Sequence, residues 1–193
     1  MEPDPAAHAG FGAELRVDWI GPDLLGSAGG RLGLTGLPGK SGASVRYPGR
    51  TYARDLDTDL ATLAAAGVGR LILLVEDSEL QRWSRLDIVE RARRHGVEVL
   101  RHPIPDGEAP SSTELMARVL DEVDQGRART DVAVACMGGV GRSGTVAACA
   151  LVRAGSTPDA AIMLVRSIRH PSAVETREQE AFVRAYAATL DRP

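Results

Sequence analysis

The stretch from Cys136 to Gly144, with the sequence CMGGVGRSG, constrains this chain more than any other feature. Five residues separate its cysteine from its arginine, and three of them are glycine. The apolar run 132–135 precedes the stretch and an apolar helical pattern over 145–152 follows it, which predicts a loop between a buried strand and a helix N-terminus. Backbone N–H groups converge at such a helix start, and glycines let successive amides turn towards one point. The stretch therefore predicts a cradle for an anion.

Two side chains of this loop carry the chemistry that the cradle predicts. Arg142 can hold two oxygens of a phosphate in a bidentate fork. The same positive surroundings favour the thiolate form of Cys136, which is the nucleophilic form. An anion cradle with a nucleophile at its floor indicates phosphoryl transfer through a cysteinyl-phosphate. The predicted phosphate-binding residues are Met137, Gly138, Gly139, Val140, Gly141 and Arg142.

Alternative roles for this loop account for less of its sequence. A buried free cysteine is often a small apolar residue of the core. Glycine-rich turns also bind nucleotides, but a P-loop has lysine where this chain has Arg142, and its glycine spacing differs. A sulfurtransferase loop of the rhodanese type contains a cysteine without the Gly-x-Gly-Arg-Ser-Gly run. A second P-loop-like sequence, Gly39-Lys40-Ser41, lacks the first glycine and is interpreted as a surface turn, with Lys40 or Arg46 near the catalytic mouth.

Length and composition favour one folded domain. The chain has 193 residues, of which 44% are hydrophobic and 25% charged, as is typical of a globular domain with its own core. We predict a disordered N-terminal tail over residues 1–13, because this segment is rich in alanine, proline and glycine. Residues 14–193 are predicted to form the catalytic domain.

Charge and cysteine usage limit the setting and the partners. A formal net charge of −3 argues against nucleic-acid binding. No apolar stretch is long enough for a membrane span, and the N-terminal residues do not resemble a signal peptide. The two cysteines give no disulfide framework, and Cys149 lies in an apolar helical pattern, where core packing is expected. We therefore expect a reduced, cytoplasmic location and no membrane partner; the sequence does not indicate an oligomeric state.

Alternating apolar strands and amphipathic helices predict an α/β fold. A central, mostly parallel twisted sheet of four to five strands is expected, flanked by helices, with the Cys-x5-Arg loop between the central strand and a helix. Ligands bind at the C-terminal edge of such sheets. Residues 21–30 are predicted as a glycine-rich turn and 36–50 as a loop. The predicted strands are 15–20, 31–37, 71–75, 97–100 and 131–136, and the predicted helices are 55–66, 80–95, 111–125 (opened by a capping box from Ser111 to Glu114), 145–154, 159–168 and 176–190.

These features together resemble the cysteine-dependent protein phosphatases, in particular the dual-specificity branch and its kinase-associated type. The family loop reads His-Cys-x-x-Gly-x-x-Arg-Ser/Thr; Gly139 matches its glycine, whereas Ala135 stands where its histidine is usual. The segments 32–39, 101–107 and 173–179 also resemble the family, so that the likeness covers about residues 14–186.

The resemblance implies a protein phosphatase that hydrolyses phosphotyrosine in a protein or peptide substrate, with phosphoserine and phosphothreonine as further candidates. No metal or other cofactor is expected, because the cradle supplies the positive charge and no His/Asp cluster has ligand spacing. Two alternatives stay open: a phosphatase of a small or non-protein phosphomonoester, and a non-catalytic phospho-binding module.

Asp106 is the candidate general acid for the leaving oxygen. It lies in a proline- and glycine-flanked loop after a strand, and such a loop can approach the site when substrate is bound. From the residues alone, Asp106-Gly107 is equally a turn dipeptide. The resemblance favours the catalytic interpretation, and Glu108 is the alternative acid. His102, beside this loop, is assigned no catalytic role.

Three further residues are assigned to the second half of the reaction. The resemblance places Gln179 and Glu175 where the family positions the water that attacks the phosphoenzyme. Glutamine is frequent at the position of Glu175, and helix capping is the alternative role for this carboxylate. Ser143 is expected to donate a hydrogen bond to the Cys136 sulfur and to cap the helix that follows.

Overall fold

Five strands form the central sheet of the computed structural model, which describes residues 14–26, 29–44, 49 and 51–190. The edge strand β1 pairs antiparallel with β2, and every other neighbouring pair in this sheet is parallel. The predicted α/β domain with a mostly parallel central sheet is confirmed. In spatial order the strands are β1 (Val17–Ile20), β2 (Leu32–Gly36), β7 (Asp131–Cys136), β5 (Val68–Leu73) and β6 (Glu98–Arg101).

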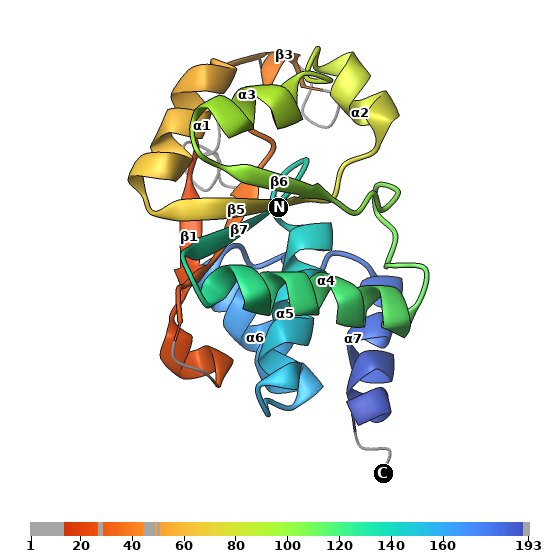
Figure 1. Cartoon of the computed structure of the whole chain (residues 1–193). Helices are drawn as coiled ribbons and strands as arrows, with labels where there is room; N and C mark the ends of the chain where they lie inside the picture. The colour runs from red at the N-terminus through yellow and green to blue at the C-terminus, as the bar shows by residue number, and fades with distance from the viewer. Residues whose placement is uncertain (1–13, 27–28, 45–48, 50, 191–193) are drawn as a thin grey trace.

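Helices cover both faces of this sheet (Figure 1). Side chains alternate between the two faces along the central strand β7. Val132 and Val134 belong to the apolar cluster on the α4–α7 side, whereas Ala133 and Ala135 belong to the cluster on the α1–α3 side. The helices are α1 (Leu56–Ala65), α2 (Asp77–Arg82) and α3 (Ile88–Arg94) on one face, and α4 (Thr113–Arg127), α5 (Gly141–Arg153), α6 (Pro158–Ile168) and α7 (Arg177–Leu190) on the other.

The predicted helix over 80–95 is wrong, because the chain forms two helices there. Ser84 adopts a left-handed conformation with φ 52°. The Arg85 amide then donates to the Leu80 carbonyl at 2.8 Å, and the Ser84 amide donates to the Gln81 carbonyl at 3.0 Å. This pair of bonds is the Schellman arrangement that closes a helix C-terminus. Helix α2 therefore ends at Arg82, and the chain turns before α3 begins.

Two further local predictions need correction. The predicted loop 36–50 contains strand β3 (Ser41–Ala43), which pairs antiparallel with β4 (Thr51–Ala53). Short strands of Ser, Gly and Ala carry little alternating pattern, so this hairpin gives a weak sequence signal. The capping box is also out of register: Ser112, not Ser111, caps α4 by accepting from the Leu115 amide.

Three remaining sequence predictions concern a turn, the N-terminal tail and membrane spans. A short 3-10 helix, η2 (Pro22–Leu25), lies within the predicted glycine-rich turn. The predicted tail 1–13 and Arg46 lie outside the described residues. No helix in the described part of the chain combines the length and apolarity that a membrane span needs.

Candidate active site

The loop between β7 and α5 lies at the C-terminal edge of the parallel strands, where the sequence predicted it. Cys136 is the last residue of β7 and is only 3% exposed. It lines a cavity of about 980 Å³, which Arg142, Asp106 and the loop residues Met137, Gly138, Val140 and Gly141 also line. Helix α5 begins at Gly141, so its N-terminal amides and dipole favour an anion in this cavity.

One peptide unit of the loop is held from both ends. The Gly139 amide donates to the Cys136 sulfur at 3.2 Å, and the carbonyl of the same peptide unit, on Gly138, accepts from Arg169 Nη2 at 3.0 Å. The N–H and C=O of a planar trans peptide point in opposite directions. Arg169 therefore turns this amide towards the sulfur, and its Nε–H bond to the Gly139 carbonyl at 2.9 Å fixes the next unit as well.

Glycine is required at position 139. Gly139 has φ +69°, the left-handed region that other residues seldom adopt. A β-carbon there would also clash with the Thr35 carbonyl of the neighbouring strand β2. The glycine that matches the family loop thus lets the backbone pass close to β2 while its amide faces the sulfur.

Changing Arg169 to lysine should lower kcat/KM about tenfold or more without unfolding the protein. Lysine cannot reproduce the fork that binds two loop carbonyls, so the loop amides lose their fixed direction. The measurement is hydrolysis of p-nitrophenyl phosphate together with thermal unfolding. Arg184→Lys, which alters an exposed ion pair with Asp159, is the matched control and should retain wild-type activity. An unchanged kcat/KM in Arg169→Lys would contradict this role.

Arg142 is held by a carboxylate that the sequence analysis did not identify. Its Nη1 and Nη2 donate to the two carboxylate oxygens of Glu79 in α2, at 2.7 and 2.8 Å. Nη1 also donates to the Ile104 carbonyl and Nη2 to Asp106 Oδ1. Burial alone would lower the pKa of Arg142, but the bond to Glu79 and the charge of Cys136 outweigh burial, and the pKa is raised. The guanidinium is thus fixed and charged.

Asp106 reaches the site from the loop after β6. Its Oδ1 accepts from Arg142 Nη2 at 2.9 Å, and its side chain is 75% exposed. The loop is anchored on both sides of this turn: the Ile104 amide donates to the Leu74 carbonyl, and Gln179 Nε2 donates to the Glu108 carbonyl. Asp106 is therefore brought to the arginine of the cradle on a loop with fixed ends.

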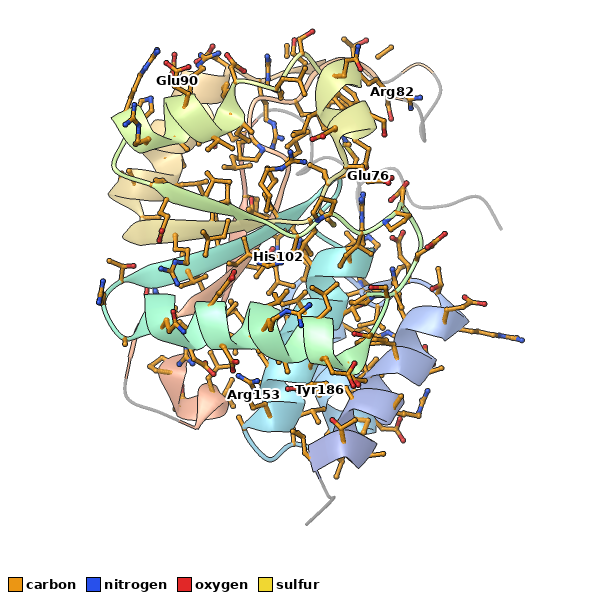
Figure 2. All side chains as sticks on the ribbon, turned by 45° about the vertical axis from the view of Figure 1, so that its right-hand side comes forward. Glu76, Arg82, Glu90, His102, Arg153 and Tyr186 are labelled. Atoms are coloured by element: carbon orange, nitrogen blue, oxygen red, sulfur yellow. The ribbon has the colours of Figure 1, made fainter. Side chains whose placement is uncertain are left out.

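His102 lies away from this chemistry. Its Nε2 is 2.6 Å from Glu122 Oε2 of α4, and Figure 2 shows the residue beside β6. His102 is not among the residues that line the cavity. His102 is therefore paired with a carboxylate of α4 and lies outside the cavity.

Glu175 and Gln179 both lie against the loop. A β-carbon on Gly141 would be 2.5 Å from Glu175 Oε2 and 3.1 Å from Gln179 Oε1. Glu175 lines the cavity, whereas Gln179 is fully buried and accepts from the Glu175 amide at 2.8 Å. Gln179 thereby joins the acid loop to the start of α7. The water-positioning role of the two residues stays a prediction.

The hydrogen bond predicted from Ser143 to the Cys136 sulfur is not formed in this structure. Ser143 Oγ is buried and has no hydrogen-bond partner within the described residues. The predicted helix cap is wrong, because α5 begins earlier than its apolar pattern: Val140 is the N-cap residue, and Ser143 lies in the first turn. Its donation to a departing thiolate stays a prediction.

Two small buried residues complete the surroundings of the loop. Cys149 packs in the apolar cluster on the α4–α7 side of the sheet, as the sequence predicted, and burial raises the pKa of its thiol. Ala135, at the family's histidine position, is fully buried in the cluster of the opposite face. In the described part of the chain, no group of His, Cys, Asp and Glu side chains has an arrangement that holds a metal ion.

The site contains a buried cysteine whose sulfur accepts a hydrogen bond from a loop amide, and an arginine that is held in place by a carboxylate. This combination defines a cysteine-dependent phosphatase. Residues 51–188 match the family described as PTP-SAK, the Swiss Army Knife protein DSP-PTPase phosphatase domain, and the chain belongs to this family. The resemblance predicted from the sequence is confirmed. The chain is a protein phosphatase domain of the dual-specificity type.

Curated relatives and solved structures agree with this assignment. Cyclin-dependent kinase inhibitor 3 of Sus scrofa is 29% identical over 164 residues, which cover 82% of this chain and 73% of that protein. The Rattus norvegicus protein of the same name is 28% identical over 181 residues, covering 91% and 80%.

Among solved structures, a kinase associated phosphatase with its catalytic site cysteine substituted by serine has a TM-score of 0.80 at 22% identity, covering 94% of this chain and 98% of that chain. Tk-PTP in the active form is 32% identical with a TM-score of 0.66, covering 82% and 92%.

Proposed function

We propose that this chain hydrolyses phosphotyrosine in proteins or peptides through a cysteinyl-phosphate on Cys136, with phosphoserine and phosphothreonine as further substrates. The observation that supports the proposal most directly is the Gly139 amide aimed at the Cys136 sulfur, in a cavity that Arg142 and Asp106 also line. A cavity of about 980 Å³ has room for the ring of a tyrosine ester.

In the first step the Cys136 thiolate attacks phosphorus in line with the ester oxygen. The S–P bond forms as the P–O bond breaks, and the leaving oxygen takes a proton from Asp106. Arg142 and the loop amides hold the charge that develops on the phosphoryl oxygens.

In the second step water attacks the cysteinyl-phosphate. Asp106, now a carboxylate, accepts the proton of this water, and the thiolate leaves as inorganic phosphate forms. Ser143 donates to the departing sulfur, and Glu175 and Gln179 orient the water.

Arg142 also links substrate binding to the acid. Nη2 donates to Asp106 in the ligand-free structure, so an incoming phosphate competes with the Asp106 carboxylate for this donor. When phosphate takes the donor, the released carboxylate accepts a proton from water or from the monoanionic phosphate ester, and Asp106 can then donate this proton to the leaving oxygen.

A set of phosphopeptides tests this function. Peptides of one sequence carrying phosphotyrosine, phosphoserine or phosphothreonine are incubated with the protein and a metal chelator, and phosphate release is measured. Acid quenching during turnover should trap phosphate on Cys136. We expect the phosphotyrosine peptide to react fastest, because its long ester reaches the floor of the cavity.

The same assay separates the two alternatives. Peptide binding without phosphate release would instead identify a phospho-binding module, which needs neither a nucleophile nor an acid. Release from small phosphomonoesters but from no peptide would identify a phosphatase of non-protein substrates.

The setting proposed for this reaction is a reducing one, as in the cytoplasm. Cys136 and Cys149 are both free thiols in the structure, and an oxidised Cys136 cannot attack phosphorus. The proposed partner is a phosphorylated protein, which accords with curated relatives named cyclin-dependent kinase inhibitor 3.

A further inference from the structure

Lys40 is the only lysine of the chain, and it lines the active-site cavity. Its Nζ lies 4.1 Å from the centroid of the Tyr52 ring and 5.1 Å from that of the Trp83 ring. The two rings are buried and pack edge to face with centroids 5.9 Å apart. Cation–π attraction to two fixed rings therefore holds the ammonium group in one place.

The rings belong to elements that also build the catalytic site. Tyr52 is the central residue of β4, and Trp83 follows α2, the helix that carries Glu79. Lys40 itself precedes β3, which pairs with β4. The ammonium group is thus positioned by the same helix that anchors Arg142, and its place in the cavity does not depend on a flexible surface chain.

Lys40 differs from most arginines around this cavity in having no carboxylate partner within the described residues. Most arginines of the cavity wall form ion pairs with carboxylates, whereas Lys40 forms none in the described part of the chain. Burial lowers the pKa of Lys40, and the nearby Arg54 lowers it further, while Tyr52 and Cys136 act in the opposite direction. A cation in these surroundings gains from an anion that enters the cavity. The arginine pairs are Arg142 with Glu79 and Asp106, Arg169 and Arg16 with Asp18, and Arg54 with Asp59.

We propose that Lys40 binds a second anionic group of the substrate, a carboxylate or phosphate on a residue beside the phosphotyrosine that Cys136 attacks. This inference rests on the proposed function and names its substrate class, phosphotyrosine peptides with an acidic neighbour. Arg142 and the loop amides bind the reacting phosphoryl group. The Lys40 ammonium group, held on the aromatic wall that Tyr52 and Trp83 form, binds the neighbouring anion.

A purely electrostatic role towards Cys136 predicts a different result. If Lys40 only favoured the thiolate, its removal would affect every substrate to the same extent. A subsite for a second anion makes the effect depend on the residue beside the phosphotyrosine. The ratio of kcat/KM for acidic and neutral peptides separates the two roles, because a change at Cys136 cancels in this ratio.

The experiment compares peptides with Asp or Asn on both sides of one phosphotyrosine. Wild-type protein should prefer the Asp peptide about tenfold, the effect of one charge-assisted hydrogen bond in a partly buried site. Lys40→Met, which keeps the alkyl chain and removes the charge, should abolish this preference, and Lys40→Arg should restore it. Arg118→Met removes one exposed charge on α4, away from the cavity, and should keep the wild-type ratio.

Binding to the Cys136→Ser protein tests the subsite independently of turnover. Calorimetric titration should give an about tenfold lower Kd for the Asp peptide, and Lys40→Met in this background should equalise the two Kd values. Equal Kd values for the Asp and Asn peptides, or a preference that survives Lys40→Met, would overturn the inference. Absence of phosphate release from all peptides, with the Kd difference intact, would instead contradict the proposed function alone.

A third peptide identifies the natural anion. Phosphoserine in place of Asp offers the same subsite a phosphate, and whichever of the two gives the larger ratio is the group that Lys40 prefers. Thermal unfolding of each variant is measured alongside, and Lys40→Arg keeps the test decisive if Lys40→Met folds poorly.

Discussion

Cys136→Ser should abolish phosphate release from a phosphotyrosine peptide, with a loss in kcat of at least about 10⁴-fold. A serine hydroxyl stays protonated at neutral pH, and it is a weak nucleophile without an adjacent base to take its proton. Phosphate binding should persist, because Arg142 and the amides of α5 and the loop do not depend on the sulfur. Hydrolysis of p-nitrophenyl phosphate and calorimetric titration with inorganic phosphate measure the two properties.

The second cysteine provides the matched control. Cys149 lies in the same helix α5 that begins at the loop, but it is fully buried in the core, and burial raises the pKa of its thiol. Cys149→Ala should lower the melting temperature and leave phosphate release close to that of the wild type. Sustained turnover by Cys136→Ser would rule out the covalent mechanism, and an equal loss in both variants would contradict the assignment of the nucleophile to Cys136.

The parts of the site that local sequence pattern predicted lie close together in the chain, whereas the distant residues Asp106, Glu175 and Gln179 were assigned with the help of the family resemblance. Cys136, Gly139 and Arg142 belong to one loop, and its geometry follows from glycine freedom and from a helix that begins at once. The apolar runs that flank the loop also predicted the central strand and the covering helices. Local pattern was sufficient for these features because each is determined by neighbouring residues.

The supports of the loop could not be predicted in the same way. Glu79 is 63 positions from Arg142, and Arg169 is 30 positions from Gly139. Glu79 lies on a helix, where a carboxylate usually faces solvent, and Arg169 is the C-cap residue of α6, a position where a basic residue is common without any functional role. Only the tertiary structure, which brings Glu79 and Arg169 within hydrogen-bonding distance, shows that these charges are partners of the loop.

The break between α2 and α3 shows a second limit of sequence patterns. The amphipathic pattern continues across residues 80–95, and Ser84 carries no strong signal for a left-handed conformation, unlike glycine or asparagine. The buried side chains of Leu80 and Trp83 pack in the apolar cluster on the α1–α3 side of the sheet, and this tertiary packing favours the end of the helix at this point. The same break positions Trp83 in the aromatic wall beside Lys40.

Asp106→Asn should lower kcat about 10²- to 10³-fold for phosphotyrosine peptides, because an amide cannot donate the proton that the leaving oxygen requires. The loss should shrink for aryl phosphates with acidic phenols, such as p-nitrophenyl phosphate, since their leaving groups depart without protonation. A series of aryl phosphates of graded leaving-group basicity measures this dependence. Glu108→Gln is the matched control on the same exposed loop, and a larger loss there would assign the acid to Glu108.

The same substitution should strengthen phosphate binding while it slows turnover. The Asp106 carboxylate accepts from Arg142 Nη2 at 2.9 Å, so it competes with a phosphate oxygen for this donor and repels the phosphate charge. Asparagine removes the repulsion, and the inhibition constant of inorganic phosphate should fall several-fold as kcat falls. If Asp106 only shaped the loop, its substitution would weaken both turnover and phosphate binding. If Asp106 is an acid that alternates between Arg142 and the leaving oxygen, kcat should fall while phosphate affinity rises. Opposite changes in these two quantities therefore identify Asp106 as the acid.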